Sequence, residues 1–212
     1  MDIFKNLKIV VFIYDRFTAL DAIGPYEVFS RIPNAEVFFV ALKPGIYSDG
    51  QTLSIEVKHS LNEIEKPDVI VIPGGFGIDS LLQNREILDW IRLTHNTTQF
   101  TASVCSGALL LAAAGLLKNI KATTHWNRVE QLKKYGVEVV NKRYVHDGKI
   151  ITSAGVSAGI DMALYMISKL ANEKLAQIIQ LSMEYDPQPP FNSGSPEKAP
   201  KEIVEILKKV IK

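Results

Sequence analysis

One cysteine lies where a nucleophile would be expected. Cys105 follows an apolar run, Thr101 to Val104, and precedes Ser106, Gly107 and a helical stretch of small residues, Ala108 to Leu117. A strand that turns sharply into a helix strains the backbone of the turn residue, and small neighbours let strand and helix approach. The pattern predicts a nucleophile elbow, in which N–H groups at the helix N-terminus favour the thiolate. A buried, inert cysteine is the alternative from position alone.

Two further groups are expected at the same edge of a sheet. Gly74 and Gly75 follow the apolar run Val69 to Ile72, where backbone N–H groups can stabilise an anion or oxyanion. Asp21 lies just beyond the first expected strand, and a carboxyl group beside a cysteine can exchange a proton with a substrate. Its alternative role is to cap a helix or to interact with the helix dipole. Ligands of open α/β sheets bind beyond the carboxyl ends of the strands, so these groups and Cys105 should share one crevice.

The chain has four histidines, and none is adjacent to Cys105. His125, in the run ATTHW, is the best candidate for a general base or for a wall of a binding pocket. A partly buried, hydrogen-bonded histidine explains the same residue equally well. No ligands cluster at metal-binding spacing, so no metal site is expected. The glycine run also lacks the lysine and the third glycine of the nucleotide-binding fingerprints.

The composition favours one sizeable core and no strong electrostatic field. The 212 residues are 47% hydrophobic, and 24 Lys and Arg against 23 Asp and Glu leave a net charge of +1. This balance argues against binding to nucleic acid or to an anionic membrane. No apolar run reaches membrane-spanning length, no secretory leader is evident, and a single reactive thiol suits a reducing compartment. We therefore expect one domain over residues 1–212, located in the cytoplasm.

Expected strands and helices alternate along the chain, which predicts a doubly wound, mostly parallel sheet between helical layers. The expected strands are 8–14, 37–42, 53–57, 69–72, 99–104 and 137–140. The expected helices are 19–32, with a break at Gly24-Pro25, and 79–93, 108–117, 159–170, 173–183 and 201–212. Asp147-Gly148, within residues 144–153, predicts a small antiparallel hairpin appended to the sheet. The proline-rich residues 186–200 are interpreted as a loop that wraps an edge or a dimer partner.

The order of these motifs gives the chain a family resemblance. The runs LDAIGP, PGGFG, SVCSGALLLAAAGLL, ATTHW, GVSAGIDMAL and EYDPQPPFNSGSP occur in this order over nearly the whole length. The chain resembles the PfpI-type branch of the class I glutamine amidotransferase-like superfamily, and within that branch the enzymes that hydrate isonitriles. The resemblance implies a flavodoxin-like, three-layer α/β/α fold. It also implies a homodimer with no metal or organic cofactor.

The resemblance also assigns roles to particular residues. It implies that Cys105 is the nucleophile and that Asp21 is the essential acidic residue. Backbone oxyanion or ligand-binding groups fall on Gly75 and Ser106, where the family often has threonine in place of Ser106. Protease-like members carry a histidine directly after the nucleophile, so Ser106 argues against peptidase activity. The implied activity is cysteine-dependent hydration of an isonitrile to an N-substituted formamide.

Two other functions would use the same thiol and stay open at this point. Glyoxalase III or deglycase-like chemistry on 2-oxoaldehydes would form a hemithioacetal on Cys105, with a carboxylate and His125 close by for the proton shift. A redox sensor would instead be oxidised to sulfenic or sulfinic acid. Regulators of this superfamily carry a helix-turn-helix module after the same domain. No such module is expected here, since the sequence ends at Lys212.

Overall fold

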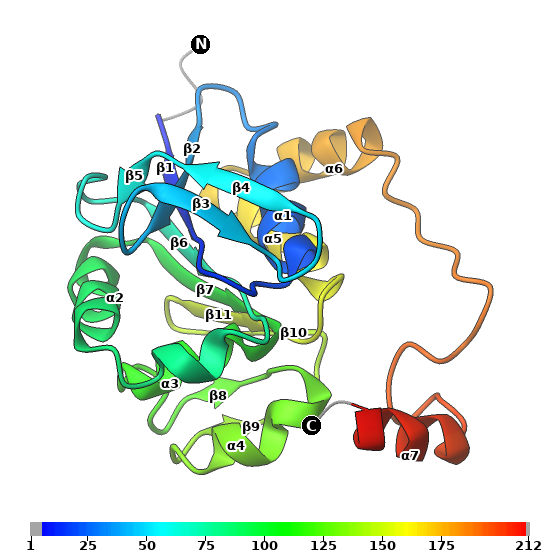
Figure 1. The fold of residues 1–212 in the computed structure, drawn as a ribbon. Helices are drawn as coiled ribbons and strands as arrows, with labels where there is room; N and C mark the ends of the chain where they lie inside the picture. The colour runs from blue at the N-terminus through cyan, green and yellow to red at the C-terminus, as the bar shows by residue number, and fades with distance from the viewer. Residues whose placement is uncertain (1–5, 211–212) are drawn as a thin grey trace.

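A seven-stranded sheet runs through the centre of the protein, as the computed structural model of residues 6–210 shows (Figure 1). The strand order is β10-β11-β7-β6-β1-β2-β5, and every neighbouring pair is parallel except β10 with β11. The strands are β1 (Lys8–Phe12), β2 (Glu36–Ala41), β5 (His59–Ser60), β6 (Val69–Ile72), β7 (Phe100–Val104), β10 (Tyr144–Asp147) and β11 (Ile150–Ser153). The predicted mostly parallel α/β fold is confirmed.

Helices cover both faces of this sheet (Figure 1). On one side α5 packs against both α1 and α6, whereas α2 and α3 pack together on the other. The α-helices are α1 (Ala19–Phe29), α2 (Arg85–Thr97), α3 (Ala108–Ala113), α4 (Val129–Lys133), α5 (Ala158–Leu170), α6 (Glu173–Ser182) and α7 (Lys201–Val210). Three 3-10 helices are η1 (Ile78–Leu81), η2 (Cys105–Gly107) and η3 (Trp126–Arg128). Within residues 6–210, no helix is long and apolar enough to cross a membrane.

Two small sheets lie beside the main one. An antiparallel pair joins β3 (Gly45–Ser48) to β4 (Ser54–Val57), and a parallel pair joins β8 (Lys121–Ala122) to β9 (Glu138–Val139). The expected strand 137–140 is thus only two residues long and lies outside the main sheet. Its neighbours on either side are a helical turn and a loop, which leave little extended chain to pair.

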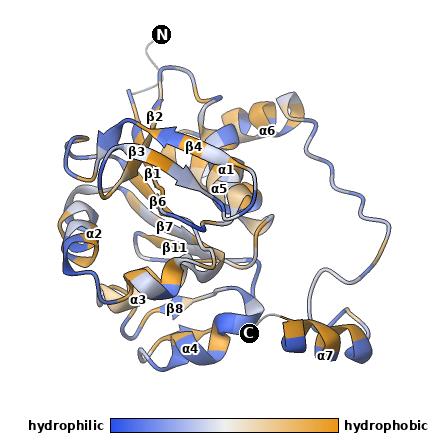
Figure 2. Ribbon diagram, viewed as in Figure 1, coloured by the Kyte–Doolittle hydropathy of each residue, from blue (hydrophilic) through white to orange (hydrophobic). Residues whose placement is uncertain are grey.

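The apolar strands form the core of the molecule (Figure 2). All four residues of β6 and four of the five residues of β1 are buried. Continuous apolar strands of this kind are typical of a parallel sheet covered on both faces. The carboxyl ends of β1, β6 and β7 consequently meet at one edge, where the candidate site is built.

The break expected at Gly24-Pro25 is absent, and α1 continues through Pro25. The two residues mark a close approach of α1 to α5. A Cβ on Gly24 would lie 3.2 Å from Ile160, and a Cβ on Gly159 would lie 3.3 Å from Pro25. Small or compact residues are required there because the two helices cross closely.

Three other expectations are corrected by the structure. The expected helix 79–93 is divided into η1 and α2, because Asn84 caps a new helix by accepting a hydrogen bond from the N–H of Ile87. The hairpin 144–153 is confirmed as antiparallel, but it is no appendage. Its strand β11 pairs in parallel with β7 and so extends the main sheet. The expected helix 108–117 also ends early, at Ala113.

Candidate active site

Cys105 is the first residue of η2 and lies at the sharp turn that follows β7. Its φ is 58°, in the left-handed region that residues with a side chain seldom adopt. Gly107 permits this turn, because a Cβ there would lie 2.0 Å from the carbonyl oxygen of Ile72. The Cys105 N–H donates to the carbonyl of Ala154 at 3.0 Å, and the Thr124 hydroxyl donates to the Cys105 carbonyl at 2.8 Å. The strand-turn-helix geometry predicted as an elbow is confirmed.

Asp21 lies in the first turn of α1 and is completely buried beside the thiol. The Gly74 N–H donates to its Oδ2 at 3.0 Å. Its Oδ1 has no nitrogen or oxygen partner among the described residues, so the Cys105 thiol is the hydrogen-bonding neighbour of this carboxyl. Asp21 does not cap α1, since Thr18 is the N-cap residue. Burial raises the pKa of Asp21 from 3.8 to about 7, against the hydrogen bonds from Cys105 and Gly74, which lower it.

Burial also holds the pKa of the Cys105 thiol well above its ordinary value, and the charge of Asp21 adds to this effect. The backbone N–H groups of Ser106 and Val156 hydrogen-bond the sulfur and oppose it. The N–H groups predicted to favour the thiolate are therefore present, but desolvation outweighs them. At neutral pH the thiol keeps its proton, and the Asp21 carboxylate is in place to take it.

The glycine turn after β6 holds the site together. The Gly75 N–H donates to Ser106 Oγ at 3.0 Å, while the Gly74 N–H is bonded to Asp21. A Cβ on Gly74 would lie 2.6 Å from both the backbone nitrogen and the hydroxyl of Ser106. Both glycine N–H groups expected to bind an oxyanion thus already have acceptors in the resting site. They fix the carboxyl of Asp21 and the hydroxyl of Ser106 instead.

A cavity of about 230 Å³ opens at the thiol. Its lining residues are Thr18, Gly75, Phe76, Cys105, Ser106, His125, Asn127, Arg128 and Val156. Four of the six residues predicted from the sequence therefore meet on one cavity. The other two, Asp21 and Gly74, contact Cys105 and Ser106 from the buried side.

His125 forms part of the cavity wall. Its Nδ1 lies 2.5 Å from Asn127 Oδ1, and no hydrogen bond joins it to Cys105 within the part of the chain that is described. The ring packs against Gly155, where a Cβ would lie 2.6 Å from the His125 Cδ2. Burial lowers the pKa of His125, so the ring is neutral at neutral pH. His125 therefore lies at the pocket, whereas no base is paired with the nucleophile among the described residues.

Two contributors were not predicted from the sequence. Val156 has a φ of 35° and directs its N–H at the sulfur of Cys105. Nothing in the sequence pointed to it, because β-branched residues are rare at positive φ. Tyr14 is buried two residues beyond β1, and its hydroxyl donates to the Pro73 carbonyl at 3.1 Å. Its position as the last residue of the expected strand 8–14 was the available signal.

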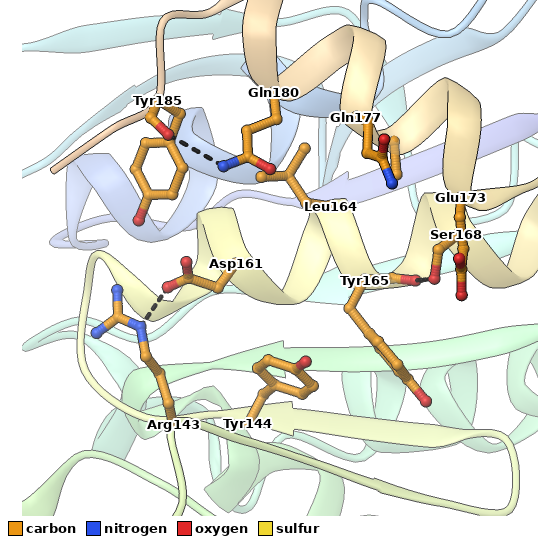
Figure 3. A pocket seen from close by; sticks show the side chains of 11 residues that line it. Arg143, Tyr144, Asp161, Leu164, Tyr165, Ser168, Glu173, Gln177, Gln180 and Tyr185 are labelled. Carbon is orange, nitrogen blue, oxygen red and sulfur yellow. Dashed lines mark hydrogen bonds and ion pairs between the residues drawn. The ribbon is translucent and has the colours of Figure 1, made fainter.

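A larger cavity of about 400 Å³ lies elsewhere, between α5, α6 and β10 (Figure 3). It is lined by no cysteine or histidine, so the cysteine chemistry belongs to the smaller cavity. Over residues 6–210, no group of three His, Cys, Asp or Glu side chains is placed to hold a metal ion.

Comparison with known proteins shows the family. Residues 7–169 match the model of the DJ-1/PfpI family. The chain belongs to the DJ-1/PfpI family. Among relatives of this DJ-1/PfpI protein, isonitrile hydratase of Pseudomonas putida is 38% identical over 205 residues, which cover 96% of this chain and 89% of that enzyme. Deglycase PfpI of Pyrococcus furiosus is 24% identical over 149 residues, or 69% and 89% of the two chains.

A solved structure extends the likeness to the fold of nearly the whole chain. The crystal structure of a ThiJ/PfpI family protein from Pseudomonas syringae has a TM-score of 0.93 and 33% sequence identity. The match covers 98% of this chain and 86% of the Pseudomonas syringae chain.

Proposed function

We propose that this DJ-1/PfpI protein hydrates isonitriles to N-substituted formamides, with Cys105 as nucleophile and Asp21 as proton carrier. The observation that carries the proposal is the buried Asp21 carboxyl, with a pKa of about 7, against the thiol at the base of a cavity. A carboxyl group whose pKa lies near the working pH can both accept and donate a proton. The similarity to the Pseudomonas putida isonitrile hydratase over 96% of this chain supports the choice of substrate.

In the first step, the Asp21 carboxylate takes the Cys105 proton while the sulfur attacks the terminal isonitrile carbon. The S–H bond breaks, a C–S bond forms, and Asp21 delivers the proton to the same carbon. The product is a thioimidate. While the sulfur carries negative charge, the N–H groups of Ser106 and Val156 stabilise it.

In the second step, water adds to the thioimidate carbon. One proton of the water ends on the substrate nitrogen and the other on the sulfur, with Asp21 as the carrier between them. The C–S bond breaks and releases the formamide and the free thiol. Splitting the hydration into two covalent steps explains why a nucleophile is used, and neither step needs a cofactor.

A second candidate is thiol addition to a 2-oxoaldehyde. His125 favours it, because this ring faces the cavity that Cys105 lines. The similarity to the Pyrococcus furiosus deglycase also supports this second candidate. Against a redox sensor, the buried thiol with its raised pKa has little of the thiolate character that oxidation requires.

We also propose that residues 1–212 act as one domain, as a homodimer in the cytoplasm, with no nucleic-acid or membrane partner. The family resemblance supports the homodimer. The net charge of +1 supports the absence of a nucleic-acid partner. A single unpaired, functional thiol supports a reducing compartment.

The test is a turnover assay with cyclohexyl isonitrile and, separately, methylglyoxal. The wild type should form N-cyclohexylformamide, and Cys105→Ser should form none above the uncatalysed rate. Consumption of methylglyoxal without formamide formation would favour the second candidate. Absence of turnover with both substrates would contradict an enzymatic function of this site.

A further inference from the structure

The last described helix displays an uncovered apolar face. Ile203, Ile206, Leu207 and Val210 of α7 recur at the spacing of one helix face, and each is between 38% and 73% exposed. No residue of α7 is buried, and its apolar side is visible in Figure 2. A ten-residue helix is only marginally stable alone in water. Its apolar face therefore needs a surface to pack against.

The C-terminal arm, defined as residues 186–210, carries α7 away from the body of the molecule (Figure 1). Residues 186–194 are all exposed, and within the described chain residues 187–194 make no backbone hydrogen bond. Prolines at 187, 189 and 190 favour an extended conformation. At about 3.1 Å per residue, such a nine-residue segment spans roughly 28 Å, about the diameter of a small domain. The arm is therefore long enough to place α7 on another molecule.

The course of the arm is shared with a solved structure. The family match ends at residue 169, before α6 and the arm. The Pseudomonas syringae structure nevertheless covers 98% of this chain at a TM-score of 0.93, and the uncovered 2% is shorter than the arm. Within the described chain, a side-chain hydrogen bond from Asn141 to Glu197 at 2.8 Å ties the arm to the body. This hydrogen bond does not involve α7, and no residue of α7 is buried. Packing within one copy therefore does not account for the position of α7.

The arm begins at the rim of the larger cavity (Figure 3). Tyr185, immediately before the arm, lines this cavity, and its hydroxyl is hydrogen-bonded to the ion pair of Arg143 with Asp161. On α6, which also lines the cavity, Ile178 and Leu181 are 54% and 80% exposed. The helix α6, which leads into the arm, thus both lines the cavity and carries uncovered apolar side chains.

We propose, resting on the homodimer proposed above, that the arm of each copy docks on the second copy, where the apolar side of α7 covers the exposed apolar side chains of α6. In a two-fold dimer the same surfaces make each contact twice. Exchange of arms would bury α7 and the exposed side chains of α6 together. A second copy is the occupant that the structure favours, because this chain carries both exposed apolar surfaces, one on α7 and one on α6, and the two do not contact each other within the described part of one copy.

Ile206→Glu tests the proposal by placing a charge at the centre of the α7 apolar face. Glu205→Gln, on the polar side of the same helix, is the matched control. Sedimentation equilibrium should give twice 23.6 kDa for wild type and control, and 23.6 kDa for Ile206→Glu at the same micromolar concentration. Leu181→Glu, on the receiving face, should also give the single mass. All three side chains are exposed, so circular dichroism should show an unchanged body fold.

A monomeric wild type would overturn the homodimer proposed above and this proposal with it. A dimeric wild type together with a dimeric Ile206→Glu variant would overturn the docking of the arm alone. A dimeric Leu181→Glu variant would overturn the assigned docking face. Exchange itself is tested by replacing Leu207 with photoreactive benzoylphenylalanine and irradiating the purified full-length chain. The expected product has twice the mass of one chain and links α7 to α5 or α6. Crosslinks confined to one chain would overturn the exchange.

Discussion

At the residue scale, the site consists of one buried carboxyl group beside one buried thiol. Two anions in contact away from water are unfavourable, so Asp21 and Cys105 hold at least one proton between them near neutral pH. The singly protonated pair contains both an acid and a base. This state suits a reaction in which the same proton leaves sulfur and arrives at carbon.

Replacing the nucleophile should remove turnover and leave the fold intact. Cys105→Ala removes one small side chain from a turn that backbone and Thr124 contacts hold, so the cavity it leaves is small. We expect formamide formation to fall to the uncatalysed rate, with an unchanged thermal unfolding profile. Full hydratase and aldehyde activity in the Ala variant would show that the sulfur is not the nucleophile.

Removing the proton carrier should separate catalysis from thiol reactivity. Asp21→Asn keeps the shape of the side chain but cannot carry a proton, so turnover should fall by roughly two to four orders of magnitude. Wild-type kcat/KM should rise with pH through about 7, because the Asp21 carboxyl then ionises and the pair keeps only the thiol proton. The kcat/KM of the variant should lack this rise. The measurement is formamide production between pH 5 and pH 8.5.

Alkylation by iodoacetamide is the control for this variant. The charge of Asp21 raises the pKa of the Cys105 thiol, so the neutral Asn should leave the thiol at least as reactive as in the wild type. Wild-type formamide production by the Asn variant would exclude Asp21 from the mechanism. Loss of alkylation together with turnover would indicate that the substitution disrupts the elbow.

At the element scale, the elements that position the nucleophile were predictable from the sequence. The continuous apolar runs of β1, β6 and β7 indicate strands buried on both faces, and such strands bring their carboxyl ends to one edge. The small residues after Cys105 indicate a close strand-to-helix turn. Local patterns were sufficient here because each feature depends on neighbours in the sequence.

Features that depend on distant segments were not predictable. The pairing of β11 with β7, and thus the place of the hairpin in the sheet, depends on the register of residues that are far apart in the sequence, such as Ile150 and Thr101. The Val156 N–H reaches the sulfur only because α5 begins against the elbow. The use of the Gly74 and Gly75 N–H groups by Asp21 and Ser106 likewise requires tertiary contacts. The raised thiol pKa follows from burial, which no local pattern specifies.

The turn that presents Val156 should depend on Arg143. The guanidinium of Arg143 donates to Ser157 Oγ at 3.2 Å and pairs with Asp161. The backbone carbonyl of Arg143 accepts a hydrogen bond from the Ala154 N–H. Arg143→Met should loosen this turn and weaken the hydrogen bond to the sulfur. A hydrogen bond to a charged group contributes about 1.5 to 3 kcal/mol, so its complete loss would slow alkylation at pH 8 by roughly ten- to hundredfold. Because the substitution weakens the bond without removing it, we expect alkylation to slow by roughly three- to tenfold.

The neighbouring Lys142→Met variant is the matched control, because Lys142 is exposed and its substitution removes the same positive charge. The readout is the pH profile of iodoacetamide alkylation, which a change in global stability alone would not displace. Superimposable profiles of the Arg143 variant and the wild type would show that Arg143 does not position the turn.

At the scale of the whole molecule, the buried Asp21 should reduce stability as pH rises. Its pKa of about 7 in the folded chain exceeds the ordinary 3.8, so between these values the folded chain keeps a proton that the unfolded chain releases. The free energy of unfolding should therefore fall across this window, by up to about 1.4 kcal/mol per pH unit, and level off above pH 7. Asp21→Asn should lack this contribution.

Denaturant unfolding of both proteins at pH 4.5, 6 and 8 measures the effect. The stability of the Asn variant relative to the wild type should increase from pH 4.5 to pH 8. Staying at or below pH 8 limits ionisation of the thiol in the unfolded chain. A difference that is the same at all three pH values would show that Asp21 titrates normally.

The most direct test of the central claim is the mass of the protein during a single turnover. Excess protein is mixed with cyclohexyl isonitrile, quenched in acid at successive times and analysed by intact and peptide mass spectrometry. We predict a transient increase equal to the mass of one whole isonitrile, located on Cys105 and decaying as formamide appears. Formamide formation at the full rate with no such adduct at any time would contradict covalent hydration by Cys105.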